Sequence, residues 1–209
     1  MGMTTEYVQY GCGLCAPQTW VNFDASPTLR FERLPFVGVL HTRNGKRFPP
    51  NVRYGDITRG LPLSANSCNA MYCSHVLEHL ALDDCDVALQ NTFKYLKPCG
   101  VFRFVLPDLE HLASEYLADG SSRGAPQFME ASCLGTKKRL RGFRGLLLAW
   151  LGNSAHLWMW EEKAMTEQLE RHGFTGIRRA AFGDAADRRF DEVEDPARFR
   201  HCLAMECHK

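Results

Sequence analysis

Apolar residues recur along the chain in blocks that follow two different spacings. Alternating or continuous short apolar runs predict strands, and apolar residues that return every three or four positions predict helices. Strands are expected at residues 7–10, 20–23, 53–57, 69–73, 101–106, 177–182 and 203–207. Helices are expected over residues 29–40, with an interruption at Pro35, and over 84–96, 109–117 and 161–172, where Gly173 provides a C-cap.

Strands that alternate with helices predict an α/β fold with a mostly parallel sheet and helices on both faces. Glycine, serine and basic residues interrupt this pattern over much of residues 120–145. We therefore expect a helical lid or substrate insertion over residues 118–160. The 209 residues suit one domain, over 1–209, that carries this insertion within it.

Charge and hydropathy narrow the possible partners of this domain. A formal net charge of +1 argues against a nucleic-acid partner, although a local charged patch remains possible. The longest aliphatic run, residues 146–151, is far too short to span a bilayer, which leaves peripheral membrane contact open. Nothing in the sequence indicates an oligomeric state.

Nine cysteines are present, but their number is odd and no secretory signal is visible. Reduced thiols and a cytoplasmic location are therefore expected rather than a disulfide framework. Cys12 and Cys15 have the spacing of a zinc or redox pair, and Cys202, Cys207 and His208 could supply distant partners. No second C-x-x-C pair strengthens that alternative.

Polar and small residues follow each of the first five predicted strands. Ligands of open parallel sheets bind beyond the carboxyl ends of the strands, so these residues are expected to converge on one site. They are Gly11, Cys12, Gly13, Asp24, Asp56, Ser74, His75 and Asp108. Glycines after the first strand let the backbone approach a ligand closely. An acid after the second strand can accept both ribose hydroxyls, and one after the third can contact an adenine edge.

Several short motifs carry a family resemblance in the same order along the chain. They are YGCG (10–13), WVNFDAS (20–26), GDITRGLPL (55–63), SHVLEHL (74–80), LKPCG (96–100), FRFVLPDLEHLASEY (102–116), AHLWMW (155–160) and LERHGF (169–174). With them the chain resembles the class I S-adenosylmethionine-dependent methyltransferases, and within these the small methyltransferase type 11 group. The resemblance covers nearly the whole chain outside residues 118–150.

This resemblance implies a Rossmann-like sheet of about seven strands with S-adenosyl-L-methionine as the cofactor. Residues 11–13 would hold the methionine part of the cofactor, Asp24 the ribose and Asp56 with Ile57 the adenine. Ser74 and His75 would lie beside the methyl group. The chain departs from the family pattern at two places. Asp24 follows Gly13 by only 11 residues, so residues 14–19 must form a loop instead of a helix. Cys99 replaces the first glycine of the usual K-P-G-G turn.

The activity that the resemblance implies is methyl transfer to an oxygen or nitrogen atom of a small-molecule or glycan substrate. A methyltransferase-like subunit that binds a partner without turnover is an alternative, and so is methylation of a protein or peptide. The motif S-H-V-L after the fourth strand differs from the N-P-P-Y type, which lowers the expectation of a nucleic-acid substrate.

The segment SHVLEHL allows three interpretations. If it opens a helix, His75, Glu78 and His79 share one face. The first interpretation is structural, with the Glu78 carboxylate near a positive helix end. The second makes His75 a general base, which suits an imidazole with a pKa near 6.5. The third is a metal site of His75, Glu78 and His79, similar to methyltransferases whose E-x-x-E-H series holds Mg²⁺, with a softer ion favoured by the additional histidine. A zinc peptidase with H-x-x-E-H spacing would need a further ligand helix, for which the surrounding motifs leave no place.

Asp108 and His156 are further candidates for acid–base catalysis. Asp108 ends the fifth strand at the same cleft, but it also suits the N-cap of the helix over 109–117. His156 would reach the cleft from the insertion, or would be packed among its apolar neighbours. Five basic residues in the insertion would meet an anionic group of the substrate or form a solvated surface: Lys137, Lys138, Arg139, Arg141 and Arg144.

Overall fold

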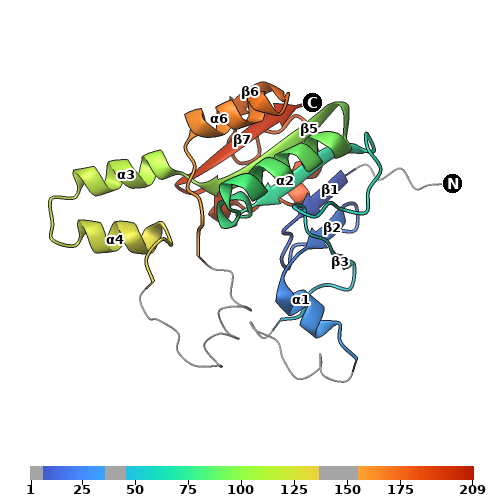
Figure 1. The fold of residues 1–209 in the computed structure, drawn as a ribbon, viewed down its shortest axis with the longest axis horizontal. Coiled ribbons are helices and arrows are strands. Elements are labelled where there is room, and N and C mark those ends of the chain that lie inside the picture. The colour runs from blue at the N-terminus through green and yellow to red at the C-terminus, as the bar shows by residue number, and fades with distance from the viewer. Residues whose placement is uncertain (1–6, 36–45, 137–154) are drawn as a thin grey trace.

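The computed structural model describes residues 7–35, 46–136 and 155–209 of the chain, which form a seven-stranded sheet (Figure 1). The strands are β1 (Tyr7–Tyr10), β2 (Val21–Asp24), β3 (Val52–Tyr54), β4 (Cys68–Ser74), β5 (Leu96–Pro107), β6 (Thr175–Arg179) and β7 (Cys202–His208). Their order in the sheet is β3-β2-β1-β4-β5-β7-β6. Strands β1 to β5 run parallel, and β7 is antiparallel to both of its neighbours. The expected seven-stranded, mostly parallel sheet is confirmed.

The helical elements are α1 (Pro27–Glu32), η1 (Leu77–His79), α2 (Leu82–Tyr95), α3 (Leu109–Ala118), α4 (Gly124–Ala131), α6 (Glu162–Arg171), η2 (Arg188–Glu192) and α7 (Pro196–Phe199). Helix α1 is shorter than expected from the sequence; its N-cap is Ser26, whose hydroxyl accepts a bond from the Thr28 amide. Residues 36–40 of the predicted helix lie outside the described part of the chain. No helix among the described residues is long and apolar enough to cross a membrane.

One face of the sheet packs against helices α2 and α6. Alternate residues of the strands point to this face, because successive side chains of a strand lie on opposite sides. Phe102 and Phe104 of β5, for example, are fully buried here with Leu89 of α2 and Leu169 of α6. This layer forms the main hydrophobic core.

The opposite face of the sheet is covered differently from the expectation. Within the described residues, its centre is covered by the segment 181–199, which contains the short helices η2 and α7. Phe190 and Val193 of this segment pack on Tyr7, Trp20 and Tyr72 of the sheet side. We name residues 181–199 the cover segment. Helices therefore lie on both faces, but those of the cover segment are only five and four residues long.

A buried arginine ties the cover segment to the sheet. Arg103 of β5 is fully buried, and its Nε donates a hydrogen bond to Glu194. Its Nη1 lies 3.0 Å from Oε2 of Glu206 on β7, and its Nη2 donates to the carbonyl of Ala181 at 2.7 Å and lies 2.9 Å from Oδ1 of Asp184. The guanidinium thus has partners on all sides, which a buried charge requires.

Helices α3 and α4 form a hairpin that projects from the body of the protein (Figure 1). No residue of α3 is buried, and Leu117 at its end is 80% exposed. Helix α3 ends where the predicted insertion, 118–160, begins, and α4 lies within it. The five basic residues expected to meet an anionic substrate lie within 137–154, outside the described residues.

Candidate functional site

A pocket of about 330 Å³ lies at the carboxyl ends of β1, β2 and β4. This is the edge of the sheet at which the sequence predicts a ligand, and the volume is within the range of small-molecule sites. Five of the predicted cofactor residues line it: Gly11, Asp24, Asp56, Ile57 and His75. Cys12, Gly13 and Ser74 are not among its lining residues. The pocket also contains residues that the sequence did not single out, such as Tyr10 and Val76.

The loop after β1 depends on glycine for two reasons. Gly11 and Gly13 have φ angles of +66° and +56°, which favour glycine. A Cβ on Gly11 would also lie only 2.2 Å from Cγ2 of Val76, whereas a Cβ on Gly13 would meet nothing within 4 Å. Between them, the Cys12 side chain is buried with Leu29 in a small cluster away from the pocket. Gly11 therefore permits a close contact within the protein, and Gly13 leaves open space.

Asp24 connects this loop to the end of β2. Its Oδ2 accepts a hydrogen bond from the Gly13 amide at 2.9 Å, and its Oδ1 accepts one from the Ser26 amide at 2.7 Å. Burial raises the pKa of this carboxyl group, and the two backbone hydrogen bonds oppose that rise. Each carboxylate oxygen can accept a further bond, so a ligand hydroxyl in the pocket can still be bound.

Asp56 and Ile57 line the pocket after β3. Oδ1 of Asp56 accepts from the Thr58 amide at 3.0 Å and from its hydroxyl at 2.7 Å, which fixes the turn. The Ile57 side chain is buried, and its carbonyl accepts a bond from Asn91 Nδ2 at 2.8 Å. The position of both residues is thereby set by neighbouring side chains.

The segment SHVLEHL does not open an α-helix, so the condition under which His75, Glu78 and His79 share one helical face is not met. His75 has a φ of +54°, and its amide donates to the carbonyl of Val105 at 2.8 Å. Only one short 3₁₀ turn, η1, follows, and α2 begins at Leu82. The left-handed backbone at His75 turns the chain across the end of the sheet, so that helix α2 begins only at Leu82. Glu78 consequently does not lie in the first turn of α2.

His75 and Glu78 nevertheless contact each other. Nδ1 of His75 lies 3.0 Å from Oε1 of Glu78, and Nε2 lies 3.3 Å from the carbonyl of Arg198 and 3.9 Å from Sγ of Cys202. Burial lowers the pKa of His75, but the interactions with Cys202 and Glu78 outweigh it and raise the pKa to about 9. An imidazolium of this kind suits the role of a fixed partner for Glu78 better than that of a general base at neutral pH.

His156 comes from the far side of the insertion and lies beside His79, which lines the pocket. The two imidazole rings are 4.9 Å apart, and Nδ1 of His79 lies 3.0 Å from the carbonyl of Ala155. The amide of Leu157 donates to the carbonyl of Glu78 at 2.8 Å, which fixes this segment against η1. Burial lowers the pKa of His156, which favours the neutral ring.

Asp108 is engaged outside the pocket. Its Oδ1 accepts from the amides of Glu110 and His111, so it is the N-cap of α3, as the structural alternative predicted. Its Oδ2 accepts from Nη2 of Arg179 at 2.5 Å. Asp108 is not among the residues that line the pocket. The acid–base role stays a prediction that no contact of Asp108 supports.

The cysteines contribute no disulfide. All nine are free, as the sequence predicted, and Cys12 is buried whereas Cys15 is exposed. Neither belongs to a group of potential metal ligands within the described residues.

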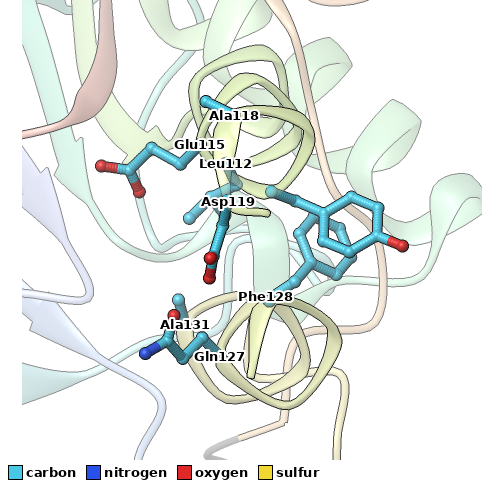
Figure 2. A pocket seen from close by; sticks show the side chains of 9 residues that line it. Leu112, Glu115, Ala118, Asp119, Gln127, Phe128 and Ala131 are labelled. Carbon is cyan, nitrogen blue, oxygen red and sulfur yellow. The ribbon is translucent and has the colours of Figure 1, made fainter. Parts of the chain in front are cut away.

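A second pocket, of about 450 Å³, lies between α3 and α4 (Figure 2). Leu112, Tyr116 and Phe128 line it together with the acidic side chains of Glu115 and Asp119. None of the predicted site residues reaches it.

Comparisons with known proteins agree with this geometry. The chain matches the model of a methyltransferase domain family, Methyltransf_23, over residues 7–178. No curated protein matches the chain significantly.

Two solved structures show the same fold at low sequence identity. One is a SAM-dependent methyltransferase from Archaeoglobus fulgidus, with 14% identity and a TM-score of 0.52, over 98% of this chain and 86% of that one. Another is a SAM-dependent methyltransferase, possibly a histamine N-methyltransferase, from Thermotoga maritima, with 14% identity and a TM-score of 0.52, over 98% of this chain and 82% of that one. The family match covers most of the chain, and the chain therefore belongs to the Methyltransf_23 family of S-adenosylmethionine-dependent methyltransferases.

Proposed function

We propose that this methyltransferase transfers the methyl group to an oxygen or nitrogen atom of a small-molecule or glycan substrate. The observation that carries the proposal is the continuity of the pocket, which runs from Asp24 and Asp56 to His75 and His79. The first two residues suit the nucleoside half of the cofactor. His75 and His79 line the same pocket, and the acceptor would approach on their side.

The residues in and beside the pocket suggest how S-adenosylmethionine would be held. Asp24 would accept the ribose hydroxyls, Ile57 would contact the adenine ring, and the methionine part would lie along the loop that begins at Gly11. The bound cofactor supplies an electrophilic methyl group on its sulfonium. The chain has to align the acceptor with that carbon and exclude water, and proximity of this kind provides roughly 7–11 kcal/mol.

We expect that Asp24→Ala weakens S-adenosylmethionine binding by about 1.5–3 kcal/mol, the range for hydrogen bonds to a charged group. Asp24 is suited to the ribose, and its loss also frees the Gly13 amide. Calorimetric titration of the cofactor measures the change. In Asp56→Asn an amide oxygen can still accept the bonds from Thr58 that fix the turn, so a loss of affinity in that variant would report the adenine contact rather than a change in the turn. Unchanged affinity in a folded Asp24→Ala protein would remove Asp24 from the cofactor site.

The acceptor class is tested by turnover. The purified protein and S-adenosylmethionine are incubated separately with small metabolites, oligosaccharides, peptides and nucleic acid, and the demethylated cofactor is quantified. Product formation with metabolites or oligosaccharides supports the proposal. Turnover confined to peptides or nucleic acid contradicts it. An acidic acceptor is expected to perform best if the basic residues within 137–144 contact it.

A further inference from the structure

We propose that Glu78, His79 and His156 bind one divalent transition-metal ion, with Zn²⁺ as the preferred ion, at the edge of the cofactor pocket. One ligand atom from each of the three residues can be chosen so that all lie within 4.8 Å of one another. The ligands of tetrahedral zinc are about 3.4 Å apart, from bond lengths near 2.1 Å. The ligand atoms therefore need to approach one another by at most about 1.4 Å.

The strongest support comes from two buried polar atoms that lack a partner. Glu78 is 0% exposed; its Oε1 is close to His75, but its Oε2 has no hydrogen-bond partner among the described residues. Nδ1 of His156 is likewise buried and unpartnered there. Buried polar atoms are nearly always satisfied, and leaving one unsatisfied costs roughly 1–3 kcal/mol. A cation bound between these atoms would satisfy both.

The surroundings orient the ligands as in known metal sites. Metal-binding histidines usually direct their second ring nitrogen to a carbonyl or carboxylate, which fixes the tautomer. Nδ1 of His79 has such a partner in the carbonyl of Ala155, so Nε2 is left for the ion. The contact between His75 and Oε1 of Glu78 in the same way holds the carboxylate with Oε2 free. His75 is therefore a positioning residue. In the set of ligands considered from the sequence, His156 takes the place of His75.

The composition of the site indicates the ion and its chemistry. Two imidazoles and one carboxylate suit zinc and its neighbours rather than Mg²⁺, and three protein ligands leave a coordination position open. Because His79 also lines the pocket, we infer that the open position faces the acceptor. This role rests on the proposed function, whereas binding of the ion does not.

For a hydroxyl acceptor, the ion would lower the pKa of the bound hydroxyl as a Lewis acid. The hydroxyl proton passes to solvent, the oxygen forms a bond to the methyl carbon, and the carbon–sulfur bond breaks. Its electron pair stays on sulfur, which becomes a neutral thioether. The ion is not consumed.

The test measures Co²⁺ as a spectroscopic probe and Zn²⁺ in competition with a chelator, on the full chain stripped of metal. We expect one equivalent bound by the unmodified protein, with a visible cobalt spectrum that lacks a thiolate charge-transfer band. His79→Ala and His156→Ala should each weaken binding by more than about 100-fold, because even outer-shell changes cost 10–100-fold. His75→Ala should weaken metal binding by only about 10–100-fold, because His75 is not a ligand.

His111→Ala is the matched control. His111, Glu115 and His201 form the other potential metal cluster among the described residues, but the Glu115 side chain is 61% exposed. This variant should retain the affinity of the unmodified protein. The proposal is overturned if the unmodified protein binds no ion, if cobalt binds through thiolate, or if His156→Ala binds as tightly as the unmodified protein. Cofactor titration of the same samples separates the two hypotheses: cofactor binding without metal refutes only the metal site, and metal binding without cofactor refutes only the proposed function.

Discussion

Replacing Arg103 by methionine is expected to lower the free energy of unfolding by about 3–5 kcal/mol, the range for removing one partner from a buried ion pair. The loss would leave Glu194 as a buried carboxylate without its cation, and Glu206 with Arg178 alone. Chemical denaturation monitored by circular dichroism measures the change. A methionine of similar length keeps the packing, so the effect reports the missing charge.

Arg178→Met is the control for this prediction. Arg178 also contacts Glu206 and Asp184, but its side chain is 39% exposed. Ion pairs of exposed groups contribute about 0–1 kcal/mol, so the loss should be several times smaller than for Arg103. Equal losses in the two variants would show that burial of Arg103 is not the source of the effect. The variant Glu194→Gln should destabilise the protein in the same direction as Arg103→Met, because Arg103 would then lose the negative charge of one buried partner.

Gly11→Ala is expected to have the second-largest effect, a loss of about 2–5 kcal/mol of stability together with weaker cofactor binding. The left-handed backbone at Gly11 costs an alanine about 1–2 kcal/mol. The contact of 2.2 Å between its Cβ and Val76 adds the cost of overpacking, about 1–3 kcal/mol. Thermal unfolding and cofactor titration of the purified variant measure the two effects.

Two further variants separate these causes. Gly13→Ala has the same backbone cost but no steric contact, so it should lose only about 1–2 kcal/mol of stability. The double variant Gly11→Ala with Val76→Ala should be more stable than the sum of the single changes, because the steric overlap is relieved. Strict additivity would contradict the close contact between Gly11 and Val76.

The sequence predicts the parts of the site that depend on local chain order. Gly11, Asp24 and Asp56 follow successive strands, and parallel strands end at one edge of a sheet, so their convergence follows from the strand pattern alone. The conformation of SHVLEHL could not be read in the same way. Its residues suit both an α-helix and a 3₁₀ turn, and the bond from the His75 amide to Val105 decides between them.

Contacts between segments that are far apart in the sequence could not be predicted either. Arg103 alternates with phenylalanines in FRFV, a pattern that usually places a charged side chain in solvent. Its burial depends on Glu194, which lies 91 positions away. His156 was expected to reach the cleft from the insertion, and the structure places it beside His79. The prediction could not include Glu78 and His156 in one group, because their approach depends on how residues 155–158 return to η1.

The cover segment has a consequence for the order in which the chain folds. Tyr7 donates a hydrogen bond to Asp187, 180 positions later, and Trp20 Nε1 donates to the carbonyl of Arg189 at 3.2 Å. During synthesis, the side of the sheet that carries these aromatic residues therefore stays open until nearly the whole described chain has left the ribosome. Contacts at such separations slow folding and expose apolar surface to aggregation in the meantime. A nascent chain that stops before Phe190 would be a substrate for chaperones, even though the layer formed by α2 and the parallel strands could already be assembled.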